Sequence, residues 1–339
     1  MNRIMRASEG YDRVLRDGPR GLLRKAKGRG YPVEYLLSRI RGRRSRLIRD
    51  WRPLIHEAAP LEYLSSPQYQ GFVRERTAEG IWRSLLKEYG WVFGQMDERE
   101  RKTFAPYFLY TELRTIFICL RYLEGDKAQK AGEVLEASLL SGDLKAILQG
   151  KDVEAALADL EAWFSRLSQA FGGLAALYGE KGLREVELRL TSRFLVYCLA
   201  LPLHAAVRDL FARIVDARNI LALYKSLRLG SRDAAVFIEG GMVAVGRLKD
   251  LLEQDDIFEV IALIRQASGV TIPAPDPTQV EVALYRGITR VLRSEGRDPL
   301  GSALLLDYLW RCSLEVMNLT ILIAGKDLAR EEVAAELVH

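Results

Sequence analysis

The feature of this sequence that most constrains its fold is a helical pattern that recurs along the chain. Five apolar residues in its middle share one helix face, with the i, i+3, i+4, i+7 spacing: Ala217, Ile220, Leu221, Tyr224 and Leu227. Subtracting 104 from the residue number gives a similar stripe at Leu113, Ile116, Phe117, Leu120 and Leu123. From residue 112 to residue 157 this offset needs no gap, and nine of 46 aligned pairs are identical. Composition alone would give roughly three.

Polar residues recur at matching places on these stripes. Glu112 aligns with Asp216 at the offset of 104. At an offset of 99, the central pair Asp216 and Asn219 recurs near the C-terminus as Glu315 and Asn318. A period of this length is too long for a solenoid repeat and favours a domain-sized unit present three times. The alternative is that any two amphipathic helices of the same polarity align this well.

A glycine pair follows the central stripe. Gly240 and Gly241 end the segment Phe237–Gly241, which predicts a tight turn because glycine adopts positive φ angles without a steric penalty. We interpret the repeated acidic and asparagine residues as helix-packing devices within each repeat rather than as contacts with a partner.

Helical periodicity extends over most of the chain, and no segment shows convincing period-two alternation. We therefore predict an all-α protein. The predicted helices cover residues 32–48, 69–89, 104–124, 144–148, 152–176, 185–201, 205–229, 278–294, 302–324 and 329–337. The proline-rich segment 269–277 is a predicted loop, because proline supplies no backbone donor.

The predicted division of the chain follows from the repeat and from this loop. Residues 1–30 are rich in arginine and glycine and are expected to form a loosely held basic arm. Three helical repeats follow, over residues 31–157, 158–268 and 269–339.

Charge is distributed unevenly. Residues 1–50 contain 15 Arg and Lys against 5 Asp and Glu, although the whole chain carries a formal charge of only +5. The predicted basic helix concentrates the candidate partner-contact residues Arg39, Arg41, Arg43, Arg44 and Arg46. Such a segment is typical of contact with nucleic acid, anionic lipid headgroups or an acidic protein, and it is also compatible with a solvated helix that has no partner.

Residue types suited to catalysis are sparse. No glycine-rich phosphate-binding loop is present, so no cofactor is predicted. The three cysteines (Cys119, Cys198, Cys312) are far apart in apolar contexts and are predicted to be buried thiols, and the five tryptophans to be core residues. None of the three histidines has metal-ligand spacing, and His204 is interpreted as a core imidazole. The longest uncharged run, 14 residues, is too short to span a bilayer, for which about 20 are needed.

Several ordered motifs together resemble the C subunit, also called the d subunit, of V-type and archaeal-type rotary ATPases. They are Tyr31–Leu47, Asp216–Ile220, Phe237–Gly241, and a C-terminal series comprising Pro299–Gly301, Tyr308-Leu309, Glu315–Leu319, Gly325-Lys326 and Glu336–Val338. The chain departs from the family pattern at Thr320, at Tyr224–Ser226 and at Thr115, which suggests a divergent member.

The resemblance implies a funnel of three similar helical domains with pseudo-threefold symmetry and no catalytic role. Such a subunit sits peripherally at the cytoplasmic face of a membrane, on the proteolipid ring. It receives the central stalk subunits and transmits torque during ion transport. The competing hypothesis is a helical nucleic-acid-binding protein that uses the basic segment, but aromatic residues for base stacking are sparse there.

Overall fold

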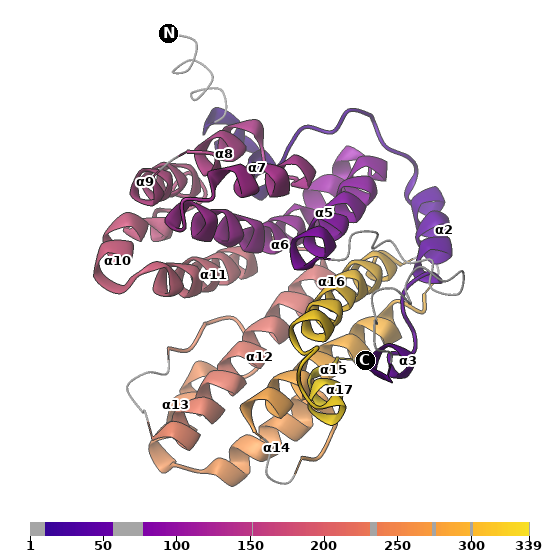
Figure 1. Ribbon diagram of the computed structural model, residues 1–339, viewed down its shortest axis with the longest axis vertical. Coiled ribbons are helices and arrows are strands. Elements are labelled where there is room, and N and C mark those ends of the chain that lie inside the picture. Colours follow the sequence, from indigo (N-terminus) through magenta and orange to yellow (C-terminus); the bar gives the residue numbers. More distant parts are fainter. Residues whose placement is uncertain are drawn as a thin grey trace. The chain divides into compact units, whose positions relative to one another are not determined.

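The computed structural model describes residues 11–56, 77–150, 152–230, 236–272, 276–298 and 301–338. The regular secondary structure in these residues is helical, and turns and loops connect the helices; an isolated β-bridge joins Leu23 and Leu140. The prediction of an all-α fold is therefore confirmed (Figure 1). The chain divides into two compact units, which are described separately: unit 1, residues 1–36 and 82–202, and unit 2, residues 37–81 and 203–339.

The first helices in chain order are η1 (Gly18–Leu22), α2 (Val33–Arg44), α3 (Arg52–His56), α5 (Ala78–Gln95), α6 (Glu98–Glu124), α7 (Ala128–Ala137), α8 (Gly142–Leu148), α9 (Val153–Phe164) and η3 (Gln169–Phe171). They are followed by α10 (Leu174–Lys181), α11 (Leu183–Ala200), α12 (Ala205–Leu229), α13 (Val245–Gln254), α14 (Ile257–Ser268), α15 (Pro277–Glu295), α16 (Ala303–Ala324) and α17 (Arg330–Glu336).

Helix ends follow local capping chemistry. The Asp97 carboxylate accepts a hydrogen bond from the Glu100 amide and starts α6, and Asp276 forms a capping box in front of Pro277 at the start of α15. Helix α12 ends at Gly230, which has the left-handed conformation typical of a helix C-cap.

Unit 1 is organised around α6, which packs against η1, α7, α8, α9 and α11. Aromatic side chains of α5 and α6 fill the space between these two helices. The Phe108 ring meets Phe93 and Tyr89 edge-on, with centroid distances of 5.4 and 5.7 Å. The Tyr89 and Tyr107 hydroxyls lie 3.2 Å apart, within hydrogen-bond reach. These contacts satisfy the buried phenols while their rings fill the core.

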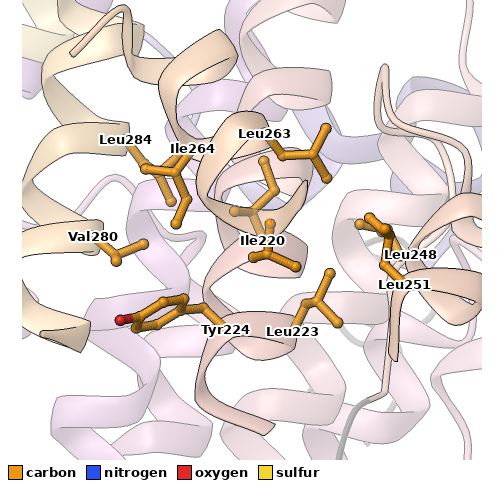
Figure 2. Close-up of a cluster of buried hydrophobic side chains, with 10 residues drawn as sticks. Ile220, Leu223, Tyr224, Leu248, Leu251, Leu263, Ile264, Val280 and Leu284 are labelled. Atoms are coloured by element: carbon orange, nitrogen blue, oxygen red, sulfur yellow. The ribbon is translucent and has the colours of Figure 1, made fainter. Parts of the chain in front are cut away.

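Unit 2 contains a bundle in which α12, α14 and α15 pack against one another and α16 packs against α15 (Figure 1). Its hydrophobic cluster comes from four helices (Figure 2): Ile220, Leu223 and Tyr224 of α12, Leu248 and Leu251 of α13, Val260, Leu263 and Ile264 of α14, and Val280 and Leu284 of α15. Complete burial of one such aliphatic side chain contributes about 1.5–3 kcal/mol. The apolar stripe predicted on α12 is therefore the inner face of this bundle.

The N-terminal region is packed more tightly than predicted. Residues 11–17 are helical, and Val14, Leu22 and Leu23 are at most 1% exposed. The expectation of a loosely held arm is thus wrong for residues 11–24. The glycines that suggested looseness instead allow close contact: a Cβ on Gly21 would collide with the backbone of Val14. Residues 1–10 lie outside the described residues.

Two further predictions need correction. Helix α6 begins at Glu98 rather than near residue 104, because Asp97 caps it and Pro106 is tolerated inside it. The single helix predicted over residues 152–176 is divided into α9, η3 and α10. The division occurs around Gly172 and Gly173, and Gly173 has a φ of 80°, which a helix interior cannot accommodate.

Candidate functional site

Asp216 and Asn219 of α12 hold the turn that follows this helix. Asp216 Oδ2 and Oδ1 accept hydrogen bonds from the Met242 and Val243 amides at 3.1 and 3.0 Å. Asn219 donates to the Ile238 carbonyl and accepts from the Ile238 amide, both at 2.8 Å. The two side chains are only 7% and 1% exposed. Together they satisfy backbone groups on both sides of the turn.

The predicted glycine turn lies between these anchor points. Gly240 has a φ of 95°, which favours glycine. A Cβ on Gly241 would collide with Asp216 Oδ1. The turn can therefore approach the buried carboxylate only because residue 241 has no side chain.

Glu112 of α6 makes the corresponding contact in unit 1. Its two carboxylate oxygens accept hydrogen bonds from the Leu139 amide and the Ser138 hydroxyl. The bonded residues lie 27 and 26 positions downstream, the same separations that connect Asp216 with Val243 and Met242. Thr115, which replaces the asparagine, instead accepts a hydrogen bond from the Trp82 indole at 3.3 Å.

The third pair, on α16, uses both ends of the chain. Asn318 donates to the Val338 carbonyl at 2.7 Å and accepts from the Val338 amide at 3.0 Å, so its clamp matches that of Asn219. Glu315 Oε1 accepts a hydrogen bond from the Ile48 amide at 3.2 Å. Ile48, which precedes Glu315 in the sequence, thus donates to this acid as downstream residues donate to Glu112 and Asp216.

Burial dominates the electrostatics of Glu112 and Asp216. Desolvation raises the pKa of Glu112, and hydrogen bonds from Leu139, Thr115 and Ser138 oppose this shift. Desolvation also raises the pKa of Asp216, against the opposing effect of the Val243 and Met242 amides. Each acid is therefore costly to ionise but is held by donors that point at its oxygens. This arrangement fixes backbone segments, and no bond-breaking chemistry is required of it.

Comparison with known proteins places the chain in a family. The sequence profile described as ATP synthase (C/AC39) subunit matches residues 36–336. The chain belongs to this family. It is 26% identical over 324 residues to the C subunits of the V-type ATP synthases from two strains of Thermus thermophilus. Each alignment covers 90% of this chain and 98% of the relative.

Membership of the C/AC39 family confirms the resemblance that the ordered motifs indicated. It supports a role as the C subunit of a V-type ATP synthase, which is a membrane-associated complex. In the described part of the chain, no helix combines the length and apolar character needed to span a bilayer.

The five arginines predicted as candidate partner contacts of this C/AC39 chain differ in their surroundings. Arg39, Arg41 and Arg46 are exposed, whereas Arg43 and Arg44 are half-buried. The Arg44 guanidinium donates to Asp307 Oδ2 at 2.8 Å and to the Gly296 carbonyl at 3.2 Å. Arg44 is therefore engaged within unit 2.

Asp307 is a structural residue of this C/AC39 chain that sequence reasoning missed. It is completely buried, and desolvation raises its pKa while Arg311 and Arg44 oppose the shift. A carboxylate within an apolar helix was a signal of a buried partner, but the partner lies 263 residues away in the sequence. Only the folded chain identifies Arg44 as that partner.

Other predicted residues have mixed outcomes. Cys119, Cys198 and Cys312 are buried thiols that form no disulfide, as expected. Four tryptophans (Trp51, Trp82, Trp163, Trp310) are buried, whereas Trp91 is only half-buried.

The interpretation of His204 as a core residue is wrong. This side chain is exposed and caps α12, where Nδ1 accepts from the Ala206 amide at 3.3 Å. Its position before a helix start was the available signal. His339, Pro299 and Leu300 lie outside the described residues.

Proposed function

We propose that this chain is a non-catalytic adaptor in the central rotor of a V-type ATPase or ATP synthase. In this role it links the central stalk to the membrane proteolipid ring and transmits torque during coupled ion transport. The observation that carries the proposal is the family match over residues 36–336, which covers nearly the whole chain.

Three sets of buried hydrogen bonds support a mechanical role. We call them clamps: Glu112 in the first, Asp216 with Asn219 in the second, and Glu315 with Asn318 in the third each bind backbone groups of another segment. An adaptor that transmits torque must resist deformation when its helices are pushed past one another. Close packing of side chains makes a protein interior stiff and lets it transmit strain. The acids and amides on α6, α12 and α16 connect a long helix to a backbone segment that the hydrophobic contacts alone would not fix. Directional hydrogen bonds of this kind restrict sliding as well as separation.

We also propose that the three clamps mark three related helical domains, arranged as a funnel with pseudo-threefold symmetry. The predicted boundaries 31–157, 158–268 and 269–339 change under this proposal, because unit 1 extends to residue 202 and so includes the first part of predicted repeat 2. The hydrogen bond between Ile48 and Glu315 groups residues near 48 with the third domain, and residues 37–81 belong to unit 2 together with α16. The third domain would then be built from both terminal regions.

The expected partners are the proteolipid ring and the central stalk subunits, with anionic lipid headgroups at the surrounding membrane surface. The expected location is peripheral, on the cytoplasmic face. Both expectations follow from the proposed role, and binding to nucleic acid is not part of it.

Reconstitution from purified parts tests the proposal. The proteolipid ring and the central stalk would be mixed in detergent with or without this chain, and the ring would then be captured. We expect the stalk to be recovered with the ring only when the chain is present. Equal recovery of the stalk without the chain, or failure of the chain to bind the ring, would contradict the adaptor role.

A variant with fewer exposed arginines tests the nucleic-acid hypothesis. Deleting residues 1–30 would also remove positive charge, but it is a less suitable test. Such a deletion would remove Leu22 and Leu23, which are completely buried, and would damage unit 1. Replacing exposed arginines by glutamine removes charge while leaving this core intact.

A further inference from the structure

Helix α2 presents a broad basic surface to solvent. Arg39 and Arg41 are exposed on the helix, and Arg46 and Arg49 are exposed directly after it. We name these four residues the α2 basic face. The only acidic residue within the helix is Glu34, in its first turn. The opposite side is apolar and inaccessible, because Leu36, Leu37 and Ile40 have no exposed area.

The spacing of the α2 basic face suits a flat partner. Successive residues of a helix are rotated by about 100° about its axis. The side chains of Arg39 and Arg41 therefore leave the axis in directions roughly 160° apart. The exposed residues Ser38, Gly42 and Ser45 are small, and a Cβ on Gly42 would meet no atom within 4 Å. A planar surface can therefore approach the helix backbone closely and contact cations on both flanks.

Aromatic residues at the start of α2 indicate the chemistry of that surface. Tyr31 and Tyr35 are 47% and 48% exposed, and their ring centroids lie 5.0 Å apart. Tyrosine has an apolar ring and a polar tip, which suits the headgroup region of a bilayer. A purely acidic protein surface would attract the arginines but would gain little from the apolar parts of these exposed rings.

We propose that the α2 basic face binds anionic phospholipid headgroups, an inference that rests on the proposed location beside the membrane ring. The contact is electrostatic and superficial. Insertion of an apolar helix face is excluded, because Leu36, Leu37 and Ile40 are already used inside the protein. Binding should therefore depend on anionic lipid and weaken as salt screens the charges.

The test uses the full chain and sedimentation with lipid vesicles. Vesicles of phosphatidylcholine would be compared with vesicles containing about one third phosphatidylglycerol, at low and high salt. We expect binding to the anionic vesicles only, and loss of this binding at high salt. The fourfold variant R39Q/R41Q/R46Q/R49Q should lower the partition coefficient on the order of 1,000-fold, from about 1 kcal/mol for each arginine near the surface.

A matched control removes the same charge elsewhere. The variant R184Q/K225Q/R228Q/K249Q loses four positive charges from exposed positions on α11, α12 and α13. It should retain most of the vesicle binding. The double variant R46Q/R49Q, which leaves α2 unchanged, should give an intermediate loss and covers the case in which the fourfold variant fails to fold.

Ring binding in detergent without anionic lipid distinguishes this inference from the adaptor role. If the fourfold variant loses vesicle binding but still binds the ring, the result supports a lipid contact. If it still binds vesicles but loses ring binding, the lipid inference is overturned in favour of an acidic protein surface. Equal loss in the control variant, or no preference of the wild-type chain for anionic vesicles, also overturns it. Tighter binding to single-stranded DNA at the same salt, lost in the same variant, would assign the face to nucleic acid.

Discussion

The amide of Ile48 donates a hydrogen bond to Glu315 Oε1 across 267 positions of sequence, at a distance of 3.2 Å. Both residues are buried, so the bond has little competition from water. In the other two clamps the acid binds residues downstream of it, whereas here Glu315 on α16 binds a residue far upstream. The third clamp therefore joins two segments that lie far apart in the sequence.

Removing this acceptor should weaken unit 2. Glu315→Ala leaves the buried Ile48 amide unsatisfied, and we expect a loss of about 1–3 kcal/mol in the free energy of unfolding. Denaturant unfolding followed by circular dichroism measures it. Glu253→Ala, at an exposed position of α13, is the control and should change stability by less than about 0.5 kcal/mol. Equal effects of the two substitutions would contradict the importance of the bond.

The two asparagine clamps should respond alike. Asn219→Asp and Asn318→Asp each replace an amide donor by an oxygen that faces a backbone carbonyl, of Ile238 or Val338. We expect each to cost about 1–3 kcal/mol, measured by denaturant unfolding. Gln266→Glu makes the same amide-to-acid change at an exposed position and serves as the control. A neutral result at either clamp would show that its geometry contributes nothing to stability.

Two glycine substitutions separate steric from conformational effects. Gly241→Ala places a methyl group against the Asp216 carboxylate, and overpacking of this kind costs about 1–3 kcal/mol. Gly246→Ala lies in α13, where the added Cβ meets nothing within 4 Å, and should stabilise the helix by up to about 1 kcal/mol. Thermal unfolding of the two variants should give shifts of opposite sign. A melting temperature for Gly241→Ala at or above that of the wild type would disprove the close approach.

The Arg44–Asp307 pair should show strong coupling. Arg44→Gln removes the guanidinium that hydrogen-bonds the buried Asp307 carboxylate, and we expect a loss of about 3 kcal/mol, at the low end for buried pairs because Arg44 is 29% exposed and Arg311 also faces the carboxylate. Adding Asp307→Asn removes the charge and should restore part of this loss. The double-mutant cycle measures the coupling by denaturant unfolding, and Arg46→Gln is the near-neutral control. Additive effects of the two changes would mean that the pair contributes no interaction energy.

The buried Glu112 should make stability depend on pH. Burial raises its native pKa above the ordinary value of 4.5, so the native state binds more protons than the unfolded state in the window above 4.5. Stability contributed by this group is therefore present below pH 4.5 and falls as the pH rises to the native pKa, by about 1.4 kcal/mol for each pH step of one within that window. Glu112→Gln should flatten the fall measured by unfolding at a series of pH values. The exposed control Glu136→Gln should leave it unchanged. A steeper fall in Glu112→Gln would reverse the assigned sign.

Many of the helices, although not α7 or α14, and the acidic positions of the clamps could be predicted from the sequence alone. Helix α12 occupies the predicted residues 205–229, and the offset of 104 aligns Glu112 with Asp216, two acids that make corresponding hydrogen bonds in the structure. Helical periodicity depends on residues three or four positions apart, and capping on the residues beside a helix end, so both are written locally in the chain.

The partners of the clamps were decided by the tertiary structure. Arg44 is one of five similar arginines in sequence, and only its position against Asp307 removes it from the exposed set. Likewise, nothing local to Ile48 indicates that its amide completes a clamp on Glu315. Burial makes each contact matter, since a polar group removed from water must find a partner wherever the chain path supplies one. Residues more than 250 positions apart become neighbours only when the whole of unit 2 has packed.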